Sequence, residues 1–256
     1  MVTVVPTLET MAEIYQLSRS GGAKSARFSS YVGFAEREWG LAGYNPMAGP
    51  HALDAVHQLM ALDAEALACA AALEVVERCK FPGDVTLAIV IASPGMWTDR
   101  VATEVRHRTS ASRRAGHGEI LLWTGDALDA GLVHREAAAE TVRVMWTTLH
   151  GAADTLGALL AREGLAYALA SNPYGPSSPV DDATVAEGIT VLGDTSTLGD
   201  IVAVLYGDAV ASCLGWTPLG LAEHAGYRWA IARSAARIVS LGAAEALLER
   251  AWNDKC

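Results

Sequence analysis

Two neighbouring predicted helices near the middle of the chain carry polar side chains whose positions suggest chemistry. In the second helix, Glu163 lies three residues after Leu160 and four before Tyr167, so its carboxylate should point inward with these apolar neighbours. A carboxylate that faces a core is costly unless it is paired or binds a cation. We therefore expect Glu163 to have a partner, and Gly164 should allow another backbone to approach closely. The alternative is that Glu163 lies at the edge of the apolar stripe and reaches solvent.

The preceding predicted helix begins with His134 and Arg135, and Glu136 and Glu140 follow at i,i+4 spacing. On most helices a glutamate pair at this spacing lies on solvated surface. Imidazole and carboxylate groups are ligands for zinc, so His134 and Glu163 are the candidates if a metal binds here. Glu136 and Glu163 are the candidates for acid–base chemistry, because a carboxylate can exchange a proton with a substrate.

Two other groups of polar residues are weaker candidates for a site. His51, Asp54 and His57 share the flank of a predicted helix, but ligands at i and i+6 diverge, so we expect no metal site there. The most basic segment, Arg106–Arg114, lies in a stretch rich in Ser, Thr, Ala and Gly. We predict that it is a solvated connector and not an anion site.

Composition excludes several classes of partner. The chain has 256 residues, of which 51% are hydrophobic, and a formal net charge of -10. No cluster of Lys and Arg offsets this charge, so we expect neither nucleic acid nor an acidic membrane as a partner. No apolar run is long enough to span a bilayer. The Ala-rich helices are compatible with a homo-oligomer.

The cysteines and the N-terminal segment indicate a cytoplasmic protein. Four cysteines are scattered without CxxC or zinc-ribbon spacing, which favours reduced thiols over a disulfide scaffold. The first residues, MVTVVPTLETMAEIY, lack the basic segment and the long apolar run of a secretory signal.

Hydrophobic periodicity predicts a mainly helical α+β protein with a small sheet and a helical C-terminal half. Strands are expected at 85–92 and 119–124, and the pattern lacks both a βαβ alternation and a GxGxxG motif. The predicted helices cover residues 7–20, 26–39, 50–79, 132–149, 156–170, 201–215 and 228–252, the last with a break at Gly242. We expect one domain over residues 1–256, with a division into lobes 1–170 and 171–256 as the open alternative.

The order of these elements resembles that of the zincin metallopeptidases. It is most similar to predicted zinc-dependent proteases whose first helix bears His-Glu-Tyr-His-His and whose second carries Glu-Gly-Leu-Ala. EILLWTGD (119–126) resembles their edge strand, LVHREAA (132–138) lies where the histidine motif belongs, and TLGALLAREGLAYALA (155–170) resembles the helix of the third ligand. LAEHAGYRWAIARSAARIV (221–239) resembles a late segment in which Ala-Gly-Tyr opens a helix. The resemblance covers roughly residues 118–241.

The histidine motif itself is degenerate. Zincin catalysis needs two histidines one helical turn apart on zinc, with a glutamate between them as general base. In one register His134 keeps the first ligand position, while Arg135 replaces the base and Ala138 the second histidine. In the register shifted by one residue, Glu136 keeps the base, while Arg135 and Ala139 replace both histidines. The resemblance therefore implies a zincin-like fold without peptidase activity and without zinc as a cofactor.

Glu163 matches the third zinc ligand in either register, which suggests how the site has changed. Arg135 could supply the positive charge that zinc supplies elsewhere and pair with Glu163, because arginine keeps its charge when buried. The former active cleft would then bind a small molecule or a peptide through His134, Arg135, Glu163 and Tyr227. Tyr227, in the matching Ala-Gly-Tyr, either donates a hydrogen bond into the cleft or packs with its hydroxyl in water.

Two enzymatic alternatives remain open at this level. The first is a metal-dependent hydrolase with a rearranged ligand set, in which His134 and Glu163 act with His150 or His224. The second is a metal-free enzyme that uses Glu136 or Glu163 as acid or base. Bound metal would separate the first alternative from the others.

Overall fold

Three parallel strands form the sheet of this protein. The computed structural model describes residues 1–19, 29–30, 50–94, 99–109, 115–176 and 179–249. The strands are β1 (Val2–Val5), β2 (Val85–Ala92) and β3 (His117–Trp123), in the order β1-β2-β3. The apolar run of β2 is almost wholly buried, as expected of a central strand. Because no described strand follows β3, β3 forms an edge of the sheet.

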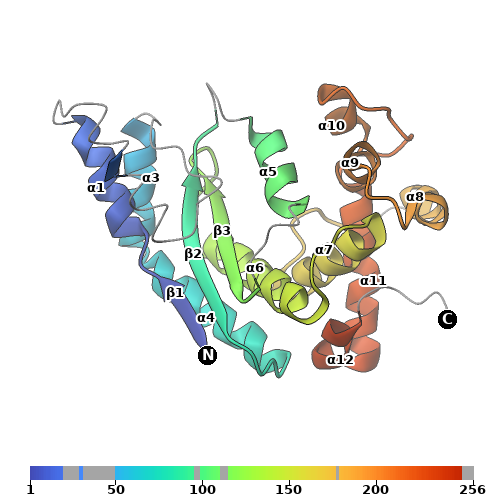
Figure 1. Ribbon diagram of the computed structural model, residues 1–256, viewed down its shortest axis with the longest axis horizontal. Helices are drawn as coiled ribbons and strands as arrows, with labels where there is room; N and C mark the ends of the chain where they lie inside the picture. Colours follow the sequence, from blue (N-terminus) through green and yellow to red (C-terminus); the bar gives the residue numbers. More distant parts are fainter. Residues whose placement is uncertain (20–28, 31–49, 95–98, 110–114, 177–178, 250–256) are drawn as a thin grey trace.

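Within the described residues, the helices that connect the strands are α1 (Leu8–Arg19), α3 (Pro50–Ala61), α4 (Ala64–Arg78) and α5 (Arg100–Thr109). The prediction that the chain lacks a βαβ alternation is wrong, because helices join strands that pair in parallel. In Figure 1, α1 and α3 lie to the left of the sheet, and α5 lies to its right, beside β3. The prediction of a single helix over residues 50–79 is wrong, because this segment forms two helices, α3 and α4. Asp63 takes a left-handed conformation (φ 52°) at the break, without a Gly or Pro to mark it in the sequence. The helix predicted over 26–39 lies largely outside the described residues.

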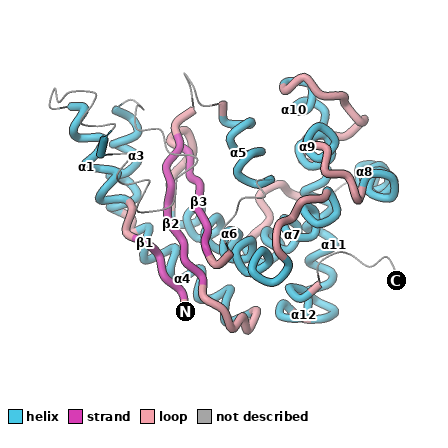
Figure 2. The backbone as a smooth tube through the Cα atoms, in the orientation of Figure 1, coloured by secondary structure: helices cyan, strands magenta, loops and turns pink. Residues whose placement is uncertain are grey.

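The C-terminal half is helical, as predicted: α6 (Ala130–His150), α7 (Leu156–Ala170), α8 (Pro179–Leu192), α9 (Leu198–Tyr206), α10 (Asp208–Cys213), α11 (Ala225–Leu241) and α12 (Ala243–Leu248). Figure 2 shows how far helices outweigh strands, which confirms the prediction of a mainly helical α+β fold. The predicted break at Gly242 is confirmed, with a φ of 90° that favours glycine. In the described part of the chain, no helix is long and apolar enough to cross a membrane.

The two central helices begin where their sequences provide caps. Asp129 accepts a hydrogen bond from the backbone N–H of Leu132 at 2.8 Å, and Thr155 accepts one from Ala158 at 3.3 Å. Such side chains satisfy amide groups that the first turn of a helix leaves unpaired. Only residues 151–155 separate α6 from α7, so α7 returns alongside α6.

Packing joins the sheet to the C-terminal helices. α6 packs on β2, β3, α4 and α7, and α7 packs in turn on α11. A Cβ atom at Gly164 would lie 2.5 Å from the backbone oxygen of Ala230 on α11, so the predicted close approach at this glycine is confirmed. One hydrophobic core extends from Leu8 to Leu247 across both halves of the chain.

Candidate functional site

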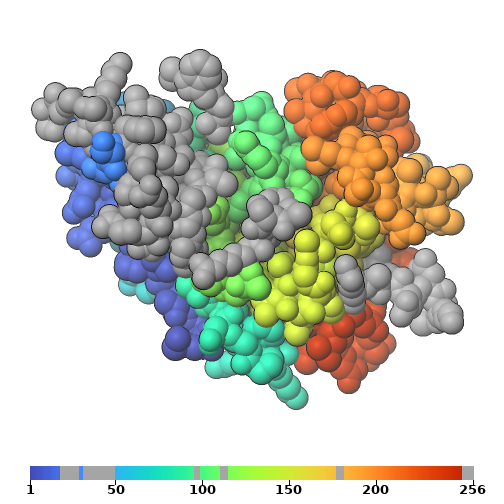
Figure 3. Space-filling model, in the orientation of Figure 1, coloured from blue at the N-terminus to red at the C-terminus, as the bar shows by residue number. Residues whose placement is uncertain are grey.

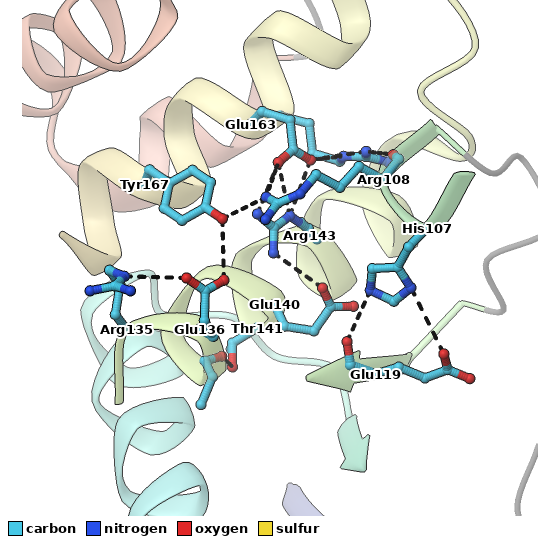
Figure 4. A network of polar contacts seen from close by, with 12 residues as sticks. His107, Arg108, Glu119, Arg135, Glu136, Glu140, Thr141, Arg143, Glu163 and Tyr167 are labelled. Atoms are coloured by element: carbon cyan, nitrogen blue, oxygen red, sulfur yellow. Dashed lines mark hydrogen bonds and ion pairs between the residues drawn. The ribbon is translucent and has the colours of Figure 1, made fainter. Parts of the chain in front are cut away.

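Glu163 is fully buried and is surrounded by three arginines (Figure 4). The Nε of Arg143 donates to both carboxylate oxygens at 3.1 and 3.0 Å, and its Nη2 donates to Oε2 at 2.9 Å. The Nε of Arg162 donates to Oε1 at 3.0 Å. Nη1 of Arg108, from α5, lies 3.4 Å from Oε2. The structure confirms that Glu163 points inward and that its carboxylate has a positively charged partner.

The three arginines keep Glu163 ionised. Burial alone raises the pKa of this carboxyl, but the positive charges of Arg143, Arg162 and Arg108 outweigh burial and hold the pKa well below its usual range. Guanidinium groups suit this arrangement because they stay charged when buried and present several donors in a rigid fork. The carboxylate therefore acts as the common counter-ion where α5, α6 and α7 meet.

The predicted partner of Glu163 was wrong. Arg135 instead donates from Nε to Oε1 of its neighbour Glu136 at 3.2 Å and remains partly exposed. The reason is the hairpin geometry of α6 and α7. Glu163 is the eighth residue of α7 and Arg143 is the eighth from the end of α6, so the short connection brings them level. Arg135 lies about two helical turns nearer the start of α6 than Arg143, so it is not level with Glu163.

Glu136 and Glu140 face the interior, so their assignment to solvated surface was also wrong. Nη1 of Arg143 donates to Oε2 of Glu140 at 3.3 Å, and the hydroxyl of Tyr167 donates to Oε2 of Glu136 at 3.2 Å. Glu140 is almost completely buried. Gly118 on β3 makes room for it, because a Cβ there would lie 2.6 Å from a carboxylate oxygen of Glu140.

A cavity of about 330 Å³ lies between β3, α5, α6 and the C-terminal helices. Five consecutive residues of β3, 119–123, line it. Successive side chains of a strand point to opposite faces, so a run of this kind can border a cavity only along the backbone edge of the strand. Figure 3 shows α5 (green) beside the segment that contains α9 and α10 (orange), both of which contribute to the wall.

Most of the other residues that line the cavity are charged or aromatic. They are Arg100, Glu104, His107 and Arg108 from α5; Arg135, Glu136, Glu140 and Arg143 from α6; and Tyr167, Tyr174, Tyr206, Glu223 and His224 from later in the chain. His107 on α5 also contacts β3. Its Nε2 lies 3.1 Å from the backbone oxygen of Glu119, and its Nδ1 lies 3.8 Å from the Glu119 carboxylate. The wall therefore offers both signs of charge within a small volume.

The structure separates the residues that the sequence grouped together. Arg135 and Glu136 line the cavity. His134 points elsewhere: it is 44% exposed, and its Nε2 lies 3.2 Å from Glu74 on α4. Glu163 lies behind the wall, where two of its arginines, Arg108 and Arg143, line the cavity.

Tyr227 also lies behind the wall. It is completely buried, its hydroxyl donates to that of Tyr206 at 3.2 Å, and its ring stacks on Tyr174 at 4.9 Å. Burial is the main cause of the raised pKa of the Tyr227 hydroxyl. Its packed position leaves Tyr174 and Tyr206 to contact a ligand.

The rearranged metal-ligand set is not brought together. His134 and Glu163 are separated as described, and Nε2 of His150 lies 2.8 Å from the backbone oxygen of Leu247. His51 of the weaker candidate group bonds to Ser93 at 2.6 Å. Within the described ranges, no group of three or more His, Cys, Asp or Glu side chains could hold a metal ion.

None of the three arginines that contact Glu163 was predicted as its partner from the sequence. Arg108 belongs to the basic segment predicted to be a solvated connector, yet α5 extends to Thr109 and directs Arg108 inward, where it is 14% exposed. Counting residues back from the loop between the two central helices would have identified Arg143. No similar local signal marks Arg108, because its partners lie more than 50 residues away.

Comparisons of the chain with protein-family models, with curated proteins and with solved structures gave no significant match. The geometry of the cavity and the charges of its wall are therefore the basis for the proposed function.

Proposed function

We propose that this chain is a zincin-like protein that binds a short, extended peptide in the cavity beside β3 and does not hydrolyse it. The observation that carries the proposal is the run of five β3 residues along the cavity, which places an edge strand of the sheet, as far as the described residues form it, against a space of about 330 Å³. An edge strand presents unpaired N–H and C=O groups that an added peptide strand can satisfy.

The size and lining of the cavity support a peptide of a few residues. Ligand pockets range from about 300 to 1,000 Å³, so the volume lies at the lower end of that range. The edge of β3 would supply main-chain hydrogen bonds. Leu121, Leu132 and Val101 would contact apolar side chains of the peptide, and the charged residues would orient its polar groups.

The donor set does not fit the zinc ion that the zincin resemblance implies. The pair at i,i+4 spacing that faces the cavity consists of Glu136 and Glu140, not of two histidines. The guanidinium of Arg143 already contacts both Glu140 and Glu163, so a fixed positive charge lies among these carboxylates. A zinc ion there would be repelled by the guanidinium and would compete for occupied oxygens. Binding without hydrolysis follows from this arrangement.

One metal-free catalytic alternative keeps a candidate residue in the cavity. Glu163 is unsuited to acid–base work because it is buried behind the wall and held ionised. Glu136 lines the cavity, with Tyr167 and Arg135 on its two oxygens. An enzyme that uses Glu136 as acid or base would convert its ligand, whereas the proposed binding protein returns it unchanged.

A tetrapeptide library tests both parts of the proposal. The protein is incubated with the library and filtered, and retained peptides are identified by mass spectrometry. We expect the wild type to retain a subset of intact peptides. Val101→Trp on α5 and Leu121→Trp on β3 would fill the cavity from two different elements and should abolish retention.

Val239→Trp is the matched control, because Val239 is 88% exposed on α11 and lies away from the cavity. It should retain the same peptides as the wild type, and circular dichroism would verify that all variants fold. Absence of retained peptides, or retention that both cavity substitutions leave unchanged, would refute peptide binding in this cavity. Cleaved peptides would refute the non-hydrolytic part.

A further inference from the structure

We propose that Arg108 forms a carboxylate-binding subsite in this cavity, so that the bound peptide places its free C-terminal carboxylate against the Arg108 guanidinium. This inference rests on the proposed peptide-binding function and specifies which end of the ligand is recognised. The three arginines that contact Glu163 are not equally well paired with it.

Glu163 is a weak partner for Arg108. The contacts of Glu163 with Arg143 and Arg162 are 2.9–3.1 Å long, within the usual range for N–H···O hydrogen bonds. The contact with Arg108 is 3.4 Å, beyond that range. The carboxylate thus mainly neutralises the other two arginines, and the charge of Arg108 is left incompletely balanced.

Arg108 also has donors to spare. A guanidinium carries five N–H donors. Nη1 uses its two on Glu163 and on the hydroxyl of Tyr167, the latter at 2.5 Å. In the part of the chain that the structure describes, Nε and Nη2 of Arg108 have no hydrogen-bond acceptor, although the side chain is largely buried. Since Arg108 lines the cavity, a ligand can supply the missing acceptors.

Tyrosine rings hold this guanidinium without consuming its donors. The Cζ atom of Arg108 lies 5.3 Å from the ring centre of Tyr167 and 5.9 Å from that of Tyr227. Contacts with ring faces are favourable for a cation and leave N–H groups in the guanidinium plane available. Nε and Nη2 lie side by side in that plane and match the two oxygens of a carboxylate.

A second unsatisfied polar atom belongs to the same wall. Nδ1 of His224 is buried and has no hydrogen-bond partner among the described residues, and the His224 ring lies 4.5 Å from that of Tyr174. Burial lowers the pKa of His224; the negative charge of Glu223 opposes this effect, and the positive charges of Arg228 and Arg108 add to it. An unpaired buried polar atom is rare in native proteins and indicates a missing ligand or water.

The other charges of the wall favour a carboxylate over a phosphate. Glu104, Glu119, Glu136 and Glu140 also line the cavity, so a dianionic group would be repelled by several carboxylates. A single negative charge held by two parallel hydrogen bonds meets less of this repulsion. The peptide C-terminus is the carboxylate that any peptide carries.

The test compares one tetrapeptide library in two forms, as free acids and as C-terminal amides. Hydrogen bonds to charged groups contribute about 1.5–3 kcal/mol, so we expect the wild type to retain the amides about tenfold to a hundredfold less. Arg108→Gln should remove this preference, and Arg108→Lys should restore part of it. Arg100→Gln is the control for the preference itself: Arg100 lines the same cavity but is already paired with Asp126, so this variant should still retain free acids better than amides, whatever its effect on total retention.

The possible results separate this inference from the function on which it rests. If the wild type retains acids and amides equally, the carboxylate subsite is refuted while peptide binding stands. If it retains neither, both proposals fail. Competition provides a further check, because acetate should displace the acid library better than inorganic phosphate at equal concentration. Stronger displacement by phosphate would overturn the assignment to a carboxylate.

Discussion

Replacement of Glu163 by glutamine would remove the carboxylate that Arg143, Arg162 and Arg108 share while keeping the size of the side chain. Arg143 would keep Glu140 as a partner. The other two arginines would lose their ion pair with Glu163, and the glutamine amide would face guanidinium groups with its own donors. We therefore expect Glu163→Gln to destabilise the protein strongly.

The expected loss follows from burial. Glu163 is fully buried, Arg143 and Arg162 are 3% and 1% exposed, and water cannot replace the lost charge at these positions. Removing one partner of a buried ion pair costs about 3–5 kcal/mol, because the remaining charge stays desolvated. Total stabilities of about 5–15 kcal/mol are usual, so the variant should remain folded but with little margin.

Urea unfolding followed by tryptophan fluorescence measures this loss. With a slope of about 3 kcal/mol per molar urea, the midpoint should fall by about 1–2 M. Glu104→Gln is the matched control, because its pair with Arg100 is partly exposed and should contribute less than about 1 kcal/mol. A midpoint for Glu163→Gln within the range of this control would show that the carboxylate is not the counter-ion of the cluster.

Three further predictions concern pH, packing and thiol chemistry. The folded-state pKa of Glu163 lies below its ordinary value of about 4.3, so its contribution to stability is complete at neutral pH and decreases as the pH falls below about 4.3. The urea midpoints at pH 7 and pH 3 should therefore differ less in Glu163→Gln than in the wild type. Gly164→Ala should cost about 1–3 kcal/mol in the free energy of unfolding, because the new Cβ would clash with α11, whereas Gly188→Ala in the open part of α8 should stabilise by about 0.5–1 kcal/mol. Burial raises the pKa of Cys79 to about 11, so iodoacetamide at pH 8 should label the exposed Cys213 well before Cys79, as peptide mass spectrometry would show; equal rates would contradict the burial of Cys79.

Local patterns in the sequence predicted the helical C-terminal half and two of the strands, but neither β1 nor the βαβ order of the parallel sheet. The β-branched run Val85–Ala92 predicted the central strand, and the caps Asp129 and Thr155 mark where the two central helices begin. The division between α3 and α4 could not be predicted in this way, because Asp63 adopts its left-handed conformation in a segment with good helical periodicity. That break depends on how both helices pack, not on the local residues.

The candidate site could be predicted only in part. Helical spacing was enough to direct Glu163 inward, and the cost of burying a carboxylate was enough to demand a partner. The identity of that partner depends on the relative position of two helices, and the short loop between them selects Arg143 over Arg135. The sequence made His134 a candidate metal ligand, yet its side chain faces α4 and not the cavity.

The sequence by itself thus determined the helical character of the C-terminal half, the central strand β2 and the presence of one inward carboxylate. These properties arise from periodicities of a few residues and from the energetic cost of an unpaired buried charge. Only the tertiary structure decided which cations meet that carboxylate, since Arg108 arrives from a helix 55 residues earlier in the chain. Long-range packing likewise decided that Glu136 and Glu140, and not a pair of histidines, face the cavity beside β3.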